Sequence, residues 1–213
     1  MVLNEGGLVS EAAPTQGSTT TAPPADGPRL PDRMLLDRRY DVGRLQADVQ
    51  TIVSTLAQPH YVYYSAIPLA MNIADAAAAD WAGQPMLDGC PYLQEIFGQF
   101  DCGITSIRLM RLEAGADIQQ HCDPTLDSVF REVVRLTLPV FSSDDVTFLL
   151  DGSPVPMQPG ELWYLRLSEL HSVHHRGSTE RINMSIDLTW NDWVEDWLRT
   201  IAEDAPSGPG TGK

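Results

Sequence analysis

The sequence predicts a mainly β protein in which a jelly-roll core is flanked by helices. Two observations predict this fold. From about residue 102 onward, short apolar runs alternate with turn residues, at the spacing of roughly eight to twelve residues that is typical of all-β sandwiches and barrels. Before and after this region, apolar residues recur at the spacing of helices that bury one face. We therefore expect the helices to pack outside the jelly roll.

Composition divides the chain into four expected parts. Its 213 residues are enough to bury the core of one domain. Residues 1–30 are rich in Gly, Ala, Pro, Ser and Thr, which predicts a flexible tail because such residues cannot offset the entropy of ordering. Residues 31–213 then form one domain, with a helical flank at 31–101, the jelly-roll core at 102–190 and a C-terminal helix at 191–203.

Local signals place the elements outside the core. Asp41 is a favourable cap for a helix whose apolar residues follow at helical spacing. Pro91 is a favourable first residue for a second, short helix. Residues 61–69 are apolar and aromatic and are expected to be extended. The last helix is expected to begin at Asn191 or Asp192. Its apolar face consists of Trp193, Val194, Trp197, Leu198 and Ile201.

Apolar runs predict the strands of the core. They are residues 104–112, 116–122, 132–141, 146–150, 155–167, 171–175 and 181–188. In the last run, apolar residues alternate with a polar face made of Arg181, Asn183, Ser185 and Asp187. Alternation by itself is typical of a sheet with one wet surface. It also fits a barrel whose polar faces line an internal cavity.

The formal charge of −15 restricts the partners. Nucleic acid and anionic membranes repel an acidic surface, so neither is expected as a partner. A small anionic substrate stays compatible, because arginines can line a pocket against the global field. The chain has no run of transmembrane length and no basic-then-apolar leader. Its three cysteines lack a metal-ligand spacing. We therefore expect a cytoplasmic protein with reduced thiols.

The histidines favour a cavity that holds a metal. His121 and Asp123 are two residues apart, so on a strand both side chains project from the same face. An imidazole and a carboxylate on one face, with a second imidazole from a later strand, form the facial triad of non-haem Fe(II) oxygenases. The second imidazole would come from residues 171–175, where His171 and His175 share a strand face. Such a triad leaves octahedral positions open for a bidentate 2-oxo acid and O₂.

Arg181 fits the same hypothesis. It follows His171 by ten residues and opens the next expected strand, on its polar face. A guanidinium there could bind the distal carboxylate of a dicarboxylic cosubstrate while the 2-oxo acid end chelates the metal. The alternative is a surface arginine beside Glu180. The order of the His-x-Asp motif, the later histidine and the arginine favours the cosubstrate site.

Residues 107–123 resemble the bacterial aspartyl/asparaginyl β-hydroxylase-like oxygenases, whose pattern here is approximately R-L-x-x-L-x-P-G-A-x-I-x-x-H-x-D. The resemblance covers about half of the chain, from residue 104 to 197. It continues in residues 134–140, 148–152, 159–165, 171–173, 177 and 181–187. Membership would imply a double-stranded β-helix of the cupin-like jelly-roll type, Fe(II), the cosubstrates 2-oxoglutarate and O₂, and hydroxylation of amino acids, free or within larger molecules.

The resemblance also implies roles for particular residues. His121, Asp123 and His171 become the iron ligands. Arg181 becomes the main anchor of 2-oxoglutarate. Arg135 becomes a second cationic contact in the cavity, with either the cosubstrate or the substrate.

The chain departs from the family pattern in three places. These are Ala114, Thr137 and His175, none of which belongs to the triad. They therefore bear on the substrate and the shape of the pocket more than on the class of reaction. Asp123 is the carboxylate that related halogenases lack, so chlorination is not expected.

The implied reaction is hydroxylation of an unactivated C–H bond in an amino acid or amino-acid-derived small molecule, with release of succinate and CO₂. Desaturation is another oxidative outcome of such a site. A free amino acid, a peptide side chain and a carrier-tethered intermediate all remain open as substrates, with residues 61–72 and 124–131 expected at the pocket entrance. Two other classes are alternatives: a jelly-roll metal protein with different chemistry, and a non-catalytic sensor of a small ligand.

Overall fold

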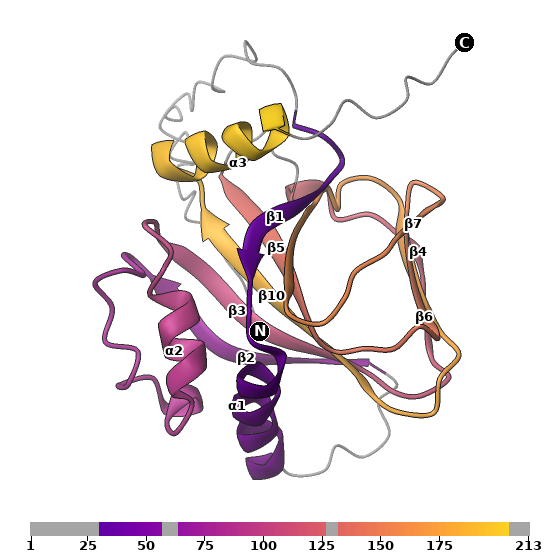
Figure 1. Ribbon diagram of the computed structural model, residues 1–213, viewed down its shortest axis with the longest axis horizontal. Coiled ribbons are helices and arrows are strands. Elements are labelled where there is room, and N and C mark those ends of the chain that lie inside the picture. Colours follow the sequence, from indigo (N-terminus) through magenta and orange to yellow (C-terminus); the bar gives the residue numbers. More distant parts are fainter. Residues whose placement is uncertain (1–29, 57–63, 127–131, 205–213) are drawn as a thin grey trace, which may run out of the picture.

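Two antiparallel sheets face each other and form a jelly roll with helices outside it, which confirms the predicted fold class (Figure 1). The computed structural model describes residues 30–56, 64–126 and 132–204. The expected tail therefore lies almost entirely outside the described residues, as do parts of both segments expected at the pocket entrance. No helix in the described ranges combines the length and apolar character needed to cross a membrane.

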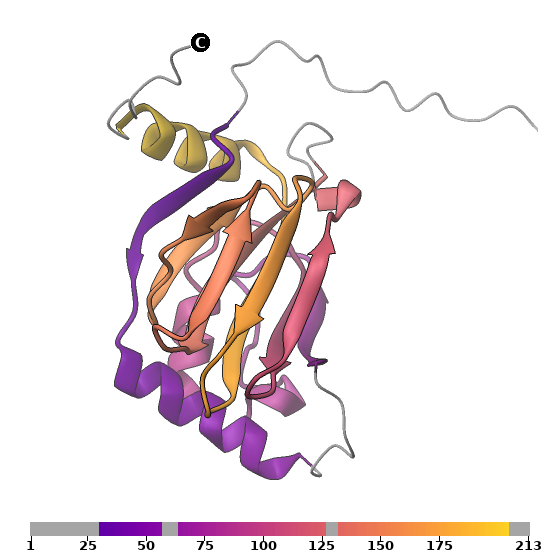
Figure 2. The same cartoon turned by 90° about the vertical axis from the view of Figure 1, so that its right-hand side faces the viewer.

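The larger sheet has six strands, in the order β1-β8-β5-β10-β3-β2. Their bounds are β1 Arg33–Arg39, β2 Tyr64–Ile73, β3 Ile104–Leu112, β5 Val133–Phe141, β8 Glu161–Leu165 and β10 Arg181–Thr189. The smaller sheet has the order β4-β9-β6-β7. Its strands are β4 Asp117–His121, β6 Val146–Leu150, β7 Ser153–Val155 and β9 His171–His175. Figure 2 shows this smaller sheet in front of the larger one.

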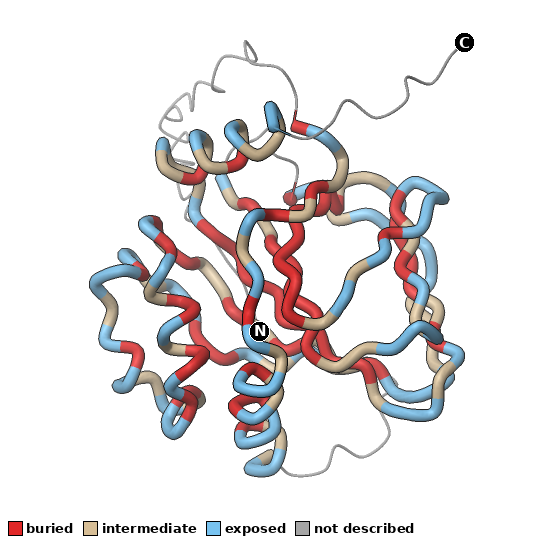
Figure 3. Tube along the Cα trace, in the orientation of Figure 1, coloured by how far each residue is buried: buried red, intermediate tan, exposed pale blue. Residues whose placement is uncertain are grey.

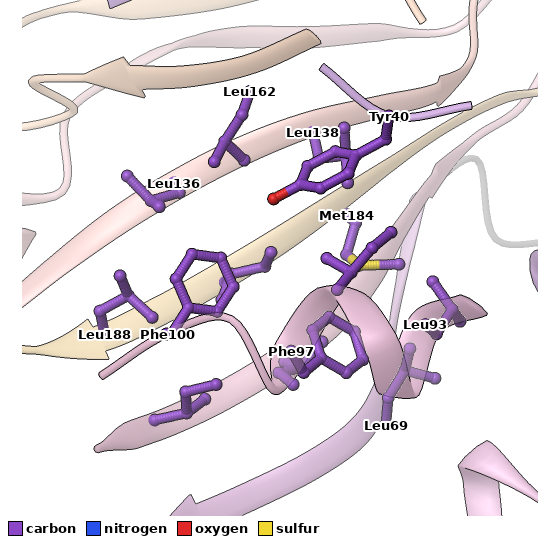
Figure 4. Packing of buried hydrophobic residues seen from close by; sticks show 14 of the residues in the cluster. Tyr40, Leu69, Leu93, Phe97, Phe100, Leu136, Leu138, Leu162, Met184 and Leu188 are labelled. Atoms are coloured by element: carbon purple, nitrogen blue, oxygen red, sulfur yellow. The ribbon is translucent and has the colours of Figure 1, made fainter. Parts of the chain in front are cut away.

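The helices cover the face of the larger sheet that is turned away from the smaller one (Figures 1 and 2). They are α1 Val42–Thr55, α2 Pro91–Phe97 and α3 Asp192–Asp204, and two short 3₁₀ turns lie at Pro85–Leu87 and Pro124–Leu126. Their apolar residues and one face of the sheet form the main core. Figure 4 shows part of it, with Phe97 of α2 and Leu138 of β5 among the packed side chains.

Carboxylates that accept hydrogen bonds from backbone N–H groups explain where α1 and α2 begin. The Asp41 carboxylate accepts a hydrogen bond from the Arg44 backbone N–H at 2.8 Å, so Asp41 caps α1 as the sequence predicts. Helix α2 begins at Pro91, also as predicted, but its own N-cap residue gives no side-chain bond. Instead the buried Asp48 carboxylate of α1 accepts from the backbone N–H groups of Tyr92 and Leu93, at 2.8 and 3.0 Å. One helix therefore caps the other.

The flank of residues 31–101 supplies two strands of the larger sheet as well as helices. β2 overlaps residues 61–69, which were expected to be extended, whereas β1 was not expected. β1 contains several charged residues, so its sequence lacks the apolar alternation by which a strand is recognised. Within the described residues, it lies at the edge of the sheet and pairs only with β8. Charged side chains are tolerated there because one side of an edge strand faces solvent.

Both faces of β10 are buried (Figure 3). Ile182, Met184, Ile186 and Leu188 belong to the main core. The four polar residues of the other face are each only 4 or 5% exposed. The alternation in this strand therefore marks a covered cavity wall, and the simpler reading as a wet surface is wrong.

We predict that Asp48→Ala lowers the free energy of unfolding by about 2 kcal/mol, because two backbone donors lose a charged acceptor inside the protein. Asp41→Ala is the matched control. It removes an exposed cap, for which about 1 kcal/mol is expected. Urea denaturation of both variants tests the difference, and a smaller loss for Asp48→Ala than for Asp41→Ala would contradict it.

Candidate functional site

A cavity of about 410 Å³ lies between the two sheets. Its apolar wall comes mainly from the smaller sheet and from Leu126 and Leu167 beside it. Most of its polar wall comes from the larger sheet, and His121 and His171 come from the smaller one. The polar and charged lining residues are Tyr64, Arg108, His121, Asp123, Thr125, Arg135, Thr137, His171, Arg181, Asn183 and Ser185.

The structure brings together the three residues that the sequence singled out as metal ligands. One potential ligand atom each of His121, Asp123 and His171 lies within 4.8 Å of the other two. The two imidazole rings are 4.2 Å apart between centroids. The ring of Phe148 stacks on His171 at 5.9 Å and supports it from the side. Two imidazoles and one carboxylate at this separation are a donor set suited to Fe(II).

An irregularity in the pairing of β4 with β9 aims His121 into the cavity. Ile118 pairs with Val173, but His121 pairs with His171, so β4 contains one more residue than β9 over this stretch. In a regular strand, Ile118 and His121 would point to opposite faces, because they are three residues apart. The extra residue lets both line the cavity, which is a usual effect of a β-bulge.

Asp123 reaches the cavity in a different way from the one predicted. The sequence argument placed it on a strand with His121, but β4 ends at His121. Asp123 lies beyond the strand, and its backbone N–H donates to the carbonyl of Leu167 at 2.7 Å. This bond holds the carboxylate beside the histidines although no ladder continues there.

The two histidines present the same nitrogen to the centre. Nδ1 of His121 lies 2.8 Å from the Gln119 carbonyl oxygen, and Nδ1 of His171 lies 3.0 Å from that of Glu169. Because a carbonyl can only accept, each Nδ1 carries a proton, so Nε2 is the nitrogen that each ring can offer to a metal. Burial lowers the pKa of His171, which favours its neutral form. Oriented, neutral imidazoles of this kind are what a metal requires.

His174 and His175 take no part in the cluster. His174 faces Asp117, with 3.4 Å between Nδ1 and the carboxylate. His175 is buried and uses both nitrogens in the turn after β9. Its Nδ1 accepts from the Gly177 N–H at 3.2 Å, and its Nε2 donates to the Thr179 carbonyl at 2.6 Å. The histidine that the sequence left as an alternative ligand is thus committed to the backbone.

Arg181 lines the cavity and is 4% exposed. Among the residues that the structure describes, it has neither a hydrogen bond nor an ion pair with another side chain. Burial lowers its pKa to about 10, so the guanidinium is still charged at neutral pH. A buried charge without a partner is strongly unfavourable, so this position suits an anionic ligand.

Arg135, which was expected as a second cationic contact in the cavity, does line the cavity and is also paired with carboxylates. Its Nε and Nη2 donate to the two oxygens of Asp187 at 2.6 and 2.8 Å. Its Nη1 lies 3.4 Å from Asp123. Arg108 donates to the same Asp187 at 2.7 Å. A chain of charges therefore leads from Arg108 through Asp187 and Arg135 to Asp123.

Sequence reasoning did not find the role of Asp187 or of Phe148. Asp187 was placed correctly on the polar face of β10, and a carboxylate on a face shared with Arg181 was a signal that arginines would gather there. Phe148 gave no signal, since its contact with His171 depends on the pairing of β6 with β9.

The arrangement fits the groups that the sequence implies. The triad offers two imidazole nitrogens and a carboxylate to a metal, and Arg181 offers a charged, bidentate donor to a carboxylate in the same cavity. A dicarboxylic 2-oxo acid is the kind of ligand that both could bind together.

The chain is similar to known proteins in sequence and in fold. The family model described as aspartyl/asparaginyl beta-hydroxylase matches residues 80–190. No curated protein matches the chain. An oxidoreductase of the 2OG-Fe(II) oxygenase family from Burkholderia pseudomallei shares 13% identity and the fold, with a TM-score of 0.50 over 74% of this chain and 84% of that one.

Two further solved structures are similar at lower scores. The α-ketoglutarate-dependent epimerase SnoN from nogalamycin biosynthesis has 12% identity and a TM-score of 0.49, over 87% of each chain. AviO1 from Streptomyces viridochromogenes Tue57 has 13% identity and a TM-score of 0.48, over 83% of this chain and 98% of that one.

The geometry of the histidines predicts different outcomes for three alanine variants. His171→Ala should abolish binding of Fe(II), whereas His174→Ala and His175→Ala should retain it. His175→Ala should also lower the free energy of unfolding by about 1–3 kcal/mol, because it removes two side-chain hydrogen bonds to the backbone of Gly177 and Thr179. Metal content per chain after anaerobic loading tests this. Loss of metal in the His175 variant and retention in the His171 variant would reverse the assignment.

Proposed function

The chain belongs to the aspartyl/asparaginyl β-hydroxylase family and is a non-haem oxygenase that depends on Fe(II) and 2-oxoglutarate, and we propose that it hydroxylates an unactivated C–H bond of an amino acid or an amino-acid-derived small molecule. The substrate is free, part of a peptide or tethered to a carrier. The expected coproducts of the reaction are succinate and CO₂.

The proposal assigns a role to each side chain of the cavity. His121, Asp123 and His171 hold the metal, and Arg181 holds the distal carboxylate of 2-oxoglutarate. Arg135 contacts Asp123 at 3.4 Å. Its role is therefore to orient this metal-binding carboxylate, and it does not bind the cosubstrate. Fe(II) with 2-oxoglutarate and O₂ supplies the oxidising power. The apolar wall that includes Ile118, Phe148 and Val173 keeps water away.

The observation that carries this proposal is that Arg181 is buried in the same cavity as the triad and has no side-chain partner among the described residues. A metal protein with other chemistry would have no use for this guanidinium, and it would bear the cost of burying it. A non-catalytic sensor would not need an intact triad. The triad and Arg181 have a joint explanation only if the cavity binds both a metal and 2-oxoglutarate, and this disfavours both alternatives.

Coupled turnover tests the function directly. With Fe(II), 2-oxoglutarate and O₂, screening of amino acids and peptides should find a compound that increases succinate formation and gains one oxygen atom. Formation of succinate is the readout that separates an oxygenase of this class from the other metal enzymes and from a sensor. Binding of 2-oxoglutarate without any succinate would favour the sensor.

We predict that Arg181→Met weakens binding of 2-oxoglutarate by about 2–5 kcal/mol, because a desolvated carboxylate loses its charged partner. The measurement is the dissociation constant of 2-oxoglutarate with Fe(II), in the absence of O₂. Arg111→Met is the control. It removes an arginine of β3 that pairs with Glu180 and does not line the cavity.

Stability of the ligand-free protein gives a second readout for the same variant. If Arg181 serves a ligand, Arg181→Met should be at least as stable to urea as the parent, since an uncompensated buried charge is removed. Unchanged affinity for 2-oxoglutarate, together with a loss of stability, would make Arg181 a structural residue.

A further inference from the structure

The carboxylate of Asp187 is buried behind the wall of the cavity, and the proposed function gives it no task. Its side chain is 7% exposed, and it is not one of the residues that line the cavity. In the pairing of β10 with β5, Asp187 lies directly opposite Arg135, a position from which two side chains can interact. A buried charge is costly without a partner, so the partners of Asp187 indicate what it does.

Arg135 connects Asp187 to the metal-binding carboxylate of Asp123. Its Nε and Nη2 atoms donate to the two oxygens of Asp187 at 2.6 and 2.8 Å. Its Nη1 atom lies 3.4 Å from Oδ2 of Asp123. This is the one hydrogen bond that the Asp123 carboxylate receives from a side chain in the described part of the protein. Arg135 is therefore held closely by Asp187 and touches Asp123 only at long range.

This division matters because a guanidinium can bind a carboxylate through two parallel hydrogen bonds. The edge of Arg135 formed by Nη1 and Nη2 is the edge nearer to Asp123. If both nitrogens were free, they would bind Asp123 in this way and compete with a cation for its oxygens. Because Nη2 is already bound to Asp187, only the single long contact from Nη1 reaches Asp123. Asp123 therefore keeps its charge available for a metal.

Asp187 is itself fixed firmly enough to act as an anchor. Besides the two bonds from Arg135, it receives one from Nη2 of Arg108 at 2.7 Å and one from the hydroxyl of Ser185 at 3.4 Å. It also lies on a strand that is paired on both sides, with β5 and with β3. Both oxygens are thus engaged, and the position of Arg135 follows from that of Asp187.

We propose that Asp187 is a positioning residue for the metal centre, which acts by holding Arg135 away from Asp123. This inference rests on the proposed function, because it takes Asp123 to be a metal ligand. Partners of ligands commonly matter for a metal site, and their loss typically lowers metal affinity by about 10–100-fold. Here the partner acts at one remove, through a guanidinium that binds the ligand too strongly when it is released.

Affinity for Fe(II) of the full chain, measured without O₂ and without 2-oxoglutarate, tests this role. Asp187→Asn keeps the shape of the side chain but loses its charge and one of its two acceptor oxygens. Arg135 should then turn to Asp123, and the dissociation constant of Fe(II) should rise by about ten-fold or more. Glu161→Gln is the matched control. It neutralises another carboxylate of the larger sheet, which is paired with Arg39 and does not line the cavity, and it should change the constant by less than about two-fold.

A double-mutant cycle separates positioning from a merely structural role. If Asp187 acts through Arg135, its substitution should matter little once Arg135 is absent. Arg135→Met/Asp187→Asn should therefore bind Fe(II) within about three-fold of Arg135→Met alone. A loss of the same size in both backgrounds would mean that Asp187 serves the metal through its charge or through the fold, and it would overturn the proposal.

The comparison also decides the matter if Asp187→Asn alone does not fold. The double variant removes both charges of the buried pair, and the Arg108 side chain that remains is 29% exposed, so it keeps contact with water. Weaker binding by the double variant than by Arg135→Met, by ten-fold or more, would again overturn the proposal. Absence of Fe(II) binding in the parent would instead remove the metal site and the proposed function. Full affinity in Asp187→Asn would remove only the positioning role.

Discussion

Strand β10 buries both of its faces in the middle of the larger sheet, and the organisation of the site follows from that constraint. One face is apolar and is covered by the helices. The other carries Arg181, Asn183, Ser185 and Asp187, which are covered by the smaller sheet and are 4–5% exposed. Buried polar groups are costly without partners, so each polar group of this face needs a partner in the protein or in a ligand.

The polar groups of β10 have hydrogen-bond partners at the Asp187 end of the strand and lack some of them at the Arg181 end. Asp187 receives hydrogen bonds from Arg135 and Arg108, which lie on the two neighbouring strands. The amide oxygen of Asn183 has no partner among the described residues, and Arg181 lacks an acidic one. A fully satisfied network rigidifies a core. An incomplete network costs free energy in the empty protein, and a ligand that supplies the missing groups would remove this cost. This is how the fold favours binding of a ligand.

Much of the fold and of the candidate site was predictable from the sequence. The parts that were not have physical reasons. The period-two pattern of residues 181–188 and the capping residue Asp41 are local signals, and the structure confirms them. β1 was missed because charged residues mask an edge strand. The prediction that His121 and Asp123 lie close together rested on an incomplete argument. It assumed a regular strand, whereas the pairing shifts before His121 and the strand ends there. The link from Arg135 to Asp187 depends on which strands are neighbours, and no local pattern contains that information.

The net charge of −15 and a cavity lined with arginines are not in conflict. Surface charges are screened over about 8 Å at physiological ionic strength, so the acidic exterior acts on an anion mainly while it approaches. Inside, a carboxylate meets a guanidinium at contact distance, where an attraction of about 4 kcal/mol is expected at an effective dielectric constant of about 20. Under the proposed function, the acidic exterior disfavours polyanions that are too large to enter. A small carboxylate can enter the cavity and reach Arg181.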